Sequence, residues 1–218
     1  MIHAYDKVYL EKARTTLARM IDFAVYDLKY DIEEFFNMFI NSGIAARFEK
    51  GDFQIIAGKS GVELAYDVAE ISGKNKRDVK PQYTANRSEE YWTGWALAYY
   101  QWKMAISFSK IVEYIPINEI KALYSPYHEM DIRHFVDKMN ELYINAKPET
   151  NLKIYRKRAG LSQKELAEQA GIPVRMIQHY EQRQKNINKA QVEYLARLSR
   201  VLNCNIEELL ELVEVESI

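Results

Sequence analysis

The residues best suited to metal or acid–base chemistry lie in one short stretch of this sequence. His128, Glu129 and Asp131 are followed by His134, and all four are residue types that bind metal ions. The two histidines are six residues apart, which places them on different faces of a helix, and the stretch does not follow the HExxH pattern. We therefore expect no metal site.

Sequence patterns for other kinds of catalysis are also missing. The sequence contains neither GxGxxG nor GxxxxGK[ST], the glycine-rich patterns that surround phosphate groups. The sequence also lacks the recognisable turn that carries the nucleophilic serine in enzymes with a Ser, His and Asp set. We expect no enzymatic activity and no cofactor, so binding is the function to look for.

A polar arrangement of another kind occupies residues 161–181. Ser162 followed by Glu165 is a capping box that begins one helix, and Gly171 can end this helix in a left-handed conformation. Pro173 suits the start of a second helix, whose outer face is polar. Two short helices joined by a tight turn, the second with a polar outer face, are the plan of a DNA-reading helix-turn-helix.

The wider segment 150–212 resembles the lambda-repressor-like (XRE) helix-turn-helix family. The residues that carry the resemblance follow the family order: Arg156, Gly160–Gln163, Leu166–Ala167, Gly171, Ile177 and Glu181. The resemblance implies five helices, of which the last two span Ala190–Leu202 and Ile206–Leu210. Two positions depart from the family pattern, Arg183 in place of Gly and Ile187 in place of Pro. We therefore expect the loop 182–188 to follow a different path.

The resemblance also implies roles in binding double-stranded DNA. The candidates for base contacts lie on the second helix of the motif: Val174, Arg175, Met176, Gln178 and His179. The candidates for phosphate contacts lie at the first helix of the motif and in the following loop: Gln163, Lys164, Lys185, Asn186 and Asn188. Arg175 is the main candidate for specificity, because its guanidinium fork matches O6 and N7 of guanine. Arg156 and Glu181 are expected to form a structural ion pair.

Charge is distributed unevenly along the chain. From Thr150 to Asn205 eleven Lys and Arg face four Glu and no Asp, so this segment carries 11 − 4 = +7, although the whole chain carries −1. Residues 1–148 hold 19 Lys and Arg against 21 Asp and Glu. The basic charge is thus concentrated where DNA phosphates would be neutralised.

Residues 1–147 are expected to form a separate all-helical domain, followed by the DNA-binding domain at 148–218. The strongest helix predicted here runs from Ser88 to Ser107. Trp92, Trp95, Tyr99 and Trp102 are spaced by three, four and three residues, as in a packed core stripe, a ligand cage or a partner groove. One helix cannot easily bury all its aromatic residues, so we expect some to bind a partner, most simply a protein: Tyr91, Trp95, Tyr99 and Tyr100.

Taken together, the sequence predicts an all-α, two-domain regulator of transcription that binds DNA in a sequence-specific manner. We expect a dimeric repressor acting on an inverted-repeat operator, because one such domain covers little DNA. The alternative is an antitoxin whose N-terminal domain neutralises a toxin while the C-terminal domain autoregulates the operon. Neither a membrane-spanning run nor a secretory signal is found, and a single cysteine rules out an internal disulfide framework. These features predict a cytoplasmic protein.

Overall fold

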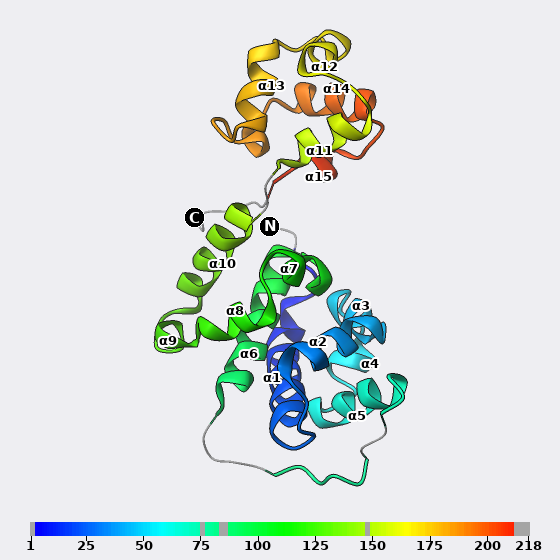
Figure 1. Cartoon of the computed structure of the whole chain (residues 1–218), viewed down its shortest axis with the longest axis vertical. Coiled ribbons are helices and arrows are strands. Elements are labelled where there is room, and N and C mark those ends of the chain that lie inside the picture. Colours follow the sequence, from blue (N-terminus) through cyan, green and yellow to red (C-terminus); the bar gives the residue numbers. More distant parts are fainter. Residues whose placement is uncertain (1–2, 75–76, 83–86, 147–148, 212–218) are drawn as a thin grey trace. The chain divides into compact units, whose positions relative to one another are not determined.

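The computed structural model describes residues 3–74, 77–82, 87–146 and 149–211. It is 70% helical, with no strand in the described ranges, which confirms the all-α class. The chain divides into two compact units, Met1–Ala146 and Lys147–Ile218 (Figure 1). None of the described helices is both long enough and apolar enough to cross a membrane.

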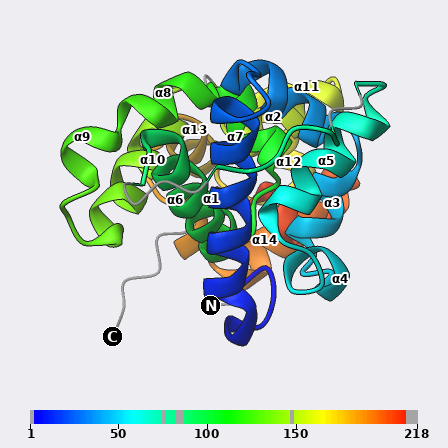
Figure 2. The same cartoon turned by 90° about the horizontal axis from the view of Figure 1, so that it is seen from below.

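The first unit is built around helix α1 (Leu10–Tyr26), whose inward face is almost completely buried. Helices α2 (Ile32–Asn41), α5 (Gly61–Ile71) and α6 (Glu89–Met104) pack against it (Figure 2). Two of these contacts depend on glycine. A Cβ added at Gly94 would lie 2.7 Å from the Cα of Ala18, and one at Gly61 would lie 2.5 Å from a backbone nitrogen of α1.

Shorter helices complete the first unit: η1 (Lys7–Tyr9), α3 (Ile44–Glu49), α4 (Phe53–Ile56), α7 (Phe108–Tyr114), α8 (Ile117–Ala122), α9 (Tyr124–Tyr127) and α10 (Ile132–Ala146). Helix α6 contacts α8, α9 and α10 on the sides that α1 does not cover. Helix α6 is therefore buried on several sides. This explains why more of its aromatic residues face inward than a one-sided helix would allow.

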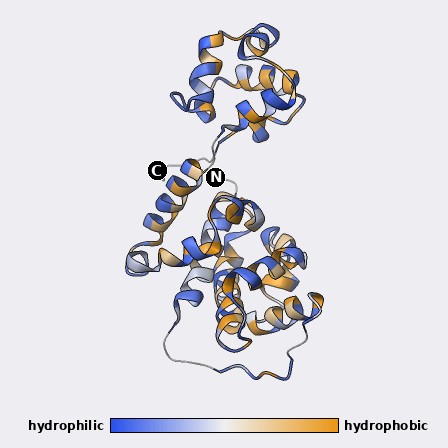
Figure 3. Ribbon diagram, viewed as in Figure 1, coloured by the Kyte–Doolittle hydropathy of each residue, from blue (hydrophilic) through white to orange (hydrophobic). Residues whose placement is uncertain are grey.

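The second unit contains α11 (Asn151–Arg158), α12 (Gln163–Ala170), α13 (Val174–Glu181), η2 (Ile187–Lys189), α14 (Val192–Leu202) and α15 (Ile206–Leu209). Five α-helices thus lie where the resemblance implies them, except that the fourth begins at Val192 and is preceded by the short η2. Leu152, Leu166, Ile177, Leu198 and Leu209 meet in one core. The helices alternate hydrophilic and hydrophobic stretches along their length, as amphipathic helices do (Figure 3).

Candidate nucleic-acid interface

Local hydrogen bonds fix the two helices of the motif and the turn between them. The Ser162 hydroxyl accepts from the backbone N–H of Glu165 at 3.1 Å, and the Glu165 carboxylate accepts from the N–H of Ser162 at 2.8 Å. The hydrogen bond from the Ser162 N–H to the carboxylate holds the pKa of Glu165 below its usual value. Gly171 ends α12 at φ +63°, a left-handed conformation that glycine adopts without strain. Helix α13 then begins directly after Pro173.

The α13 residues that were predicted to contact bases differ in how far they are exposed to solvent. Ile177 and Tyr180 are buried, which fixes the rotation of the helix about its axis. Val174 and Arg175 are exposed at its first turn, and Gln178 is half-buried one turn later. An exposed arginine at the start of such a helix can reach a base edge, because the N-terminal residues of a recognition helix lie deepest in the major groove.

Met176 and His179 were predicted to lie on the outer face of α13, but both are half-buried. Met176 packs partly against the core, and its Sδ lies 3.6 Å from the Nζ of Lys185. The backbone carbonyl of His179 accepts from the N–H groups of Gln184 and Lys185, so the loop folds back over the end of α13. The Nδ1 of His179 is buried there without a hydrogen-bond partner.

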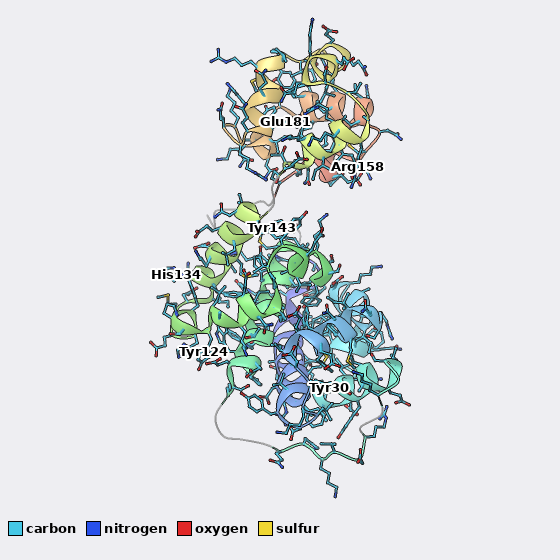
Figure 4. All side chains as sticks on the ribbon, in the orientation of Figure 1. Tyr30, Tyr124, His134, Tyr143, Arg158 and Glu181 are labelled. Carbon is cyan, nitrogen blue, oxygen red and sulfur yellow. The ribbon has the colours of Figure 1, made fainter. Side chains whose placement is uncertain are left out.

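Arg156 and Glu181 form a bidentate ion pair between α11 and the end of α13 (Glu181 is labelled in Figure 4). The Nε and Nη2 atoms of Arg156 lie 2.6 and 2.9 Å from the two carboxylate oxygens of Glu181. Their side chains are 11% and 2% exposed. The hydrogen bond to Glu181 raises the pKa of Arg156. The pair therefore holds α13 against α11.

Gln163 joins this ion pair, a contact that no sequence pattern predicts. Its Nε2 donates to a carboxylate oxygen of Glu181 at 2.8 Å. The amide N–H groups are thus turned toward the protein, while the residue stays at the N-terminus of α12, where backbone N–H groups can meet a phosphate. Lys164, the neighbouring phosphate candidate, has a side chain that is 82% exposed.

The loop after α13 accommodates both departures from the family pattern. Arg183 adopts φ +55°, so it takes a left-handed conformation that glycine would adopt at lower cost. Ile187, in place of proline, is buried in the core at the start of η2. Lys185 and Asn186 are exposed on this loop and remain candidates for phosphate contacts.

Asn188 is the phosphate candidate that the structure argues against. Its Nδ2 donates to the carbonyl of Glu211 at 3.1 Å, and its Oδ1 accepts from the N–H of Glu211 at 2.9 Å. Both ends of the amide are therefore used to attach the residues after α15 to the loop. These contacts span 23 positions of sequence, and no local pattern signals them.

The aromatic residues of α6 divide into buried and half-buried groups. Trp92 and Trp102 are buried, and Tyr91, Trp95 and Tyr99 are half-buried. Tyr100, predicted to contact a partner, is 0% exposed. That prediction is wrong, because α6 is covered on several sides and the Tyr100 hydroxyl hydrogen-bonds the buried Asn140 at 3.0 Å.

A cavity lies beside these aromatic residues, where the sequence left a ligand cage or a partner groove open, but its lining from the later part of the chain was not predicted. It is about 280 Å³ in volume and is lined by residues of α6 together with Tyr124, Tyr127 and His128 from α9 and the residue after it. His128 was considered for metal binding. In the structure its ring stacks on Tyr124 with a centroid distance of 4.1 Å. Tyr124 and His134 mark this side of the first unit in Figure 4. The spacing of Tyr124 and His128, four residues apart, was the one local sign of this stack.

Comparison with protein families gives a match within the second unit. A family model described as helix-turn-helix matches residues 152–209. Comparisons with curated proteins and with solved structures give no match to the chain. The match covers α11 to α15, the same helices that build the ion pair and the exposed face of α13. Residues 152–209 are thus a helix-turn-helix domain of the lambda-repressor-like (XRE) type, and this domain supports a general role in DNA-binding regulation of transcription.

Proposed function

We propose that the protein is a sequence-specific repressor that binds an inverted-repeat operator as a dimer. The observation that carries this proposal is the exposed first turn of α13, with Val174 and Arg175, on a segment of charge +7. Arg175 would read guanine through its two parallel N–H donors, and Val174 would contact a thymine methyl group. Lys164, Lys185 and Asn186 would hold the backbone of the DNA through its phosphates.

Dimerisation follows from the small size of the DNA-binding unit. A single domain of this kind buries little surface on DNA, and two copies on two half-sites double the contact. The half-site centres would then lie about 34–36 Å apart, one turn of the double helix. The sequence has more apolar residues near its C-terminus than one short helix needs for its own packing, and these would help dimerisation: Leu209, Leu210, Leu212 and Val213. Leu209 is buried in the core of its own unit and Leu210 packs partly against it, while Leu212 and Val213 lie outside the described residues.

The first unit would supply the regulatory input. Its charge is nearly balanced, so it lacks the basic surface of a DNA-binding domain. The half-buried Tyr91, Trp95 and Tyr99 are proposed as the place where a partner is recognised, whether a protein or a smaller molecule. An antitoxin would use the same DNA-binding unit. It would differ in binding a toxin through the first unit, and co-purification with a small toxic protein would favour that reading.

The DNA-reading proposal is tested by comparing two substitutions in the full-length protein. Arg175→Ala should weaken binding to the selected operator by about 1–3 kcal/mol and leave binding to random DNA almost unchanged. Lys164→Ala should weaken both by a similar factor and reduce the salt dependence, because it removes one phosphate contact. Arg200→Ala on the exposed surface of α14 serves as the matched control.

The operator is first obtained by selection from random duplexes, and affinities are measured by fluorescence anisotropy at several salt concentrations. If Arg175→Ala lowers both affinities by the same factor, Arg175 does not read bases. A monomer in sedimentation at tens of micromolar, together with a footprint that lacks two-fold symmetry, would overturn the dimer proposal.

A further inference from the structure

The cavity beside α6 has the dimensions and lining of a small-molecule site. Its volume of about 280 Å³ lies just below the range for such sites, roughly 300–1,000 Å³. It is formed by the N-terminal part of α6, by α9 and by the start of α10. Most of its wall is aromatic, including Tyr91, Trp92, Trp95, Tyr124 and Tyr127.

Ring contacts within the protein hold this aromatic wall in place. Trp92 makes T-shaped contacts with Tyr124 and Phe135, with centroid distances of 5.6 and 5.3 Å. Tyr124 is fixed in turn by its stack on His128, whose Nδ1 lies 2.9 Å from the carbonyl of Tyr124. A ligand entering the cavity would therefore order few side chains, and this preorganisation lowers the entropic cost of binding.

The charges at the cavity favour an anion. Arg87 lines it, with its guanidinium 5.0 Å from the centre of the Tyr91 ring, and makes no ion pair with any residue the structure describes. The face of Trp95 is already covered by the guanidinium of Arg14, at 3.3 Å from the ring centre. A cationic ligand would have to compete with these two arginines for the ring faces. An anion would instead meet the unpaired Arg87.

The carboxylates next to the lining in sequence are Glu89, Glu90, Glu129 and Asp131. Glu89 is exposed, and the Glu90 carboxylate accepts hydrogen bonds from Tyr26 and Lys121. Glu129 lies 3.5 Å from the Nε2 of His128, and Asp131 forms an ion pair with Arg133 at 2.9 Å. Neither carboxylate makes an ion pair with Arg87. A stable protein–protein interface needs about 800 Å² from each partner. Here the aromatic side chains are half-buried around a concave site, which fits a small ligand better than a flat protein surface.

We propose that this cavity binds a small, flat organic anion, such as an aromatic carboxylate. The carboxylate would accept hydrogen bonds from the Arg87 guanidinium, and the flat body would lie among Trp92, Trp95 and Tyr124. This inference rests on the proposed regulatory role of the first unit and names the class of its ligand. Met130 and Ile132 also line the cavity, so an occupant would touch the start of α10, the last helix before the DNA-binding unit.

The test uses isothermal titration calorimetry on the full-length protein in the absence of DNA. Three probes share one ring system and differ in charge: naphthoate, naphthamide and naphthylmethyl-trimethylammonium. Naphthoate should bind at least about tenfold more tightly than the neutral amide, because a hydrogen-bonded charge pair is added. Arg87→Gln should remove this preference, and Arg87→Lys should retain part of it.

Arg158→Gln is the matched control for these variants. The Arg158 guanidinium lies over Tyr155 at 5.4 Å, as Arg87 lies over Tyr91, but it does not line the cavity. Naphthoate affinity should be unchanged in this variant. The assignment of an anion would be overturned if the ammonium probe bound as tightly as naphthoate or more tightly. It would also be overturned if Arg87→Gln left the affinity for naphthoate unaltered. Absence of binding by all three probes at millimolar concentration would overturn the ligand site itself. Because DNA is left out, that result would not affect the proposed repressor function.

Discussion

Replacing Glu181 with alanine should strongly destabilise the second unit while leaving the stability of the first unit unchanged. Three hydrogen bonds end on the Glu181 carboxylate, two from Arg156 and one from Gln163. The substitution leaves the nearly buried guanidinium of Arg156 with one remaining bond, to the carbonyl of Leu161. Removing one partner of a buried ion pair costs about 3–5 kcal/mol, a large part of the roughly 5–10 kcal/mol that stabilises a unit of this size.

A matched control is available in the same unit. Glu193 pairs with Arg197 on α14, but their side chains are 65% and 44% exposed. Exposed pairs of this kind contribute about 0–1 kcal/mol. Glu193→Ala should therefore lower the stability of the unit only slightly. The comparison isolates burial, because both substitutions remove a glutamate that pairs with an arginine.

Two spectroscopic probes separate the units during urea unfolding. The three tryptophans, at positions 92, 95 and 102, all belong to the first unit, so their fluorescence reports that unit alone. Far-UV circular dichroism reports both units. Glu181→Ala should move the circular dichroism transition to lower urea and leave the fluorescence transition in place. The reasoning fails if Glu181→Ala costs no more than Glu193→Ala, or if the fluorescence transition moves as well.

Three further predictions concern packing, backbone strain and ionisation. Gly94→Ala should destabilise the first unit by about 1–3 kcal/mol, because the added Cβ would lie 2.7 Å from the α1 backbone. Urea unfolding followed by tryptophan fluorescence measures this loss, and an unchanged unfolding midpoint would contradict the prediction. Arg183→Gly should be more stable than Arg183→Ala by about 1 kcal/mol, since both remove the same side chain and only glycine relieves φ +55°; equal stabilities would show no strain. The hydrogen bond from Tyr26 to Glu90 raises the pKa of Tyr26 to about 12, so its contribution to stability is present below the ordinary phenol pKa and is lost as pH rises through about 12. NMR titration of labelled tyrosine should show this value, and Glu90→Gln should bring it back toward normal.

The sequence alone determined those features of the second unit that depend on residues close together in the chain. The capping box of Ser162 and Glu165, the left-handed Gly171 and the start after Pro173 predict α12, the turn and α13 because each acts within a few residues. The helical period then places Arg175 on the outer face. The resemblance to the lambda-repressor-like family also predicted the ion pair between Arg156 and Glu181.

Only the tertiary structure decided which side chains remain free for binding. Asn188 is occupied by the backbone of Glu211, and Gln163 by the carboxylate of Glu181. In the first unit, Tyr100 is buried because α6 is covered by helices from both earlier and later parts of the chain. The cavity at Arg87 depends on α9, which packs against α6 from more than twenty residues away in sequence. Contacts between residues far apart in sequence arise when helices pack together. The periodicity of a single helix shows which face is buried, but not which helices cover it.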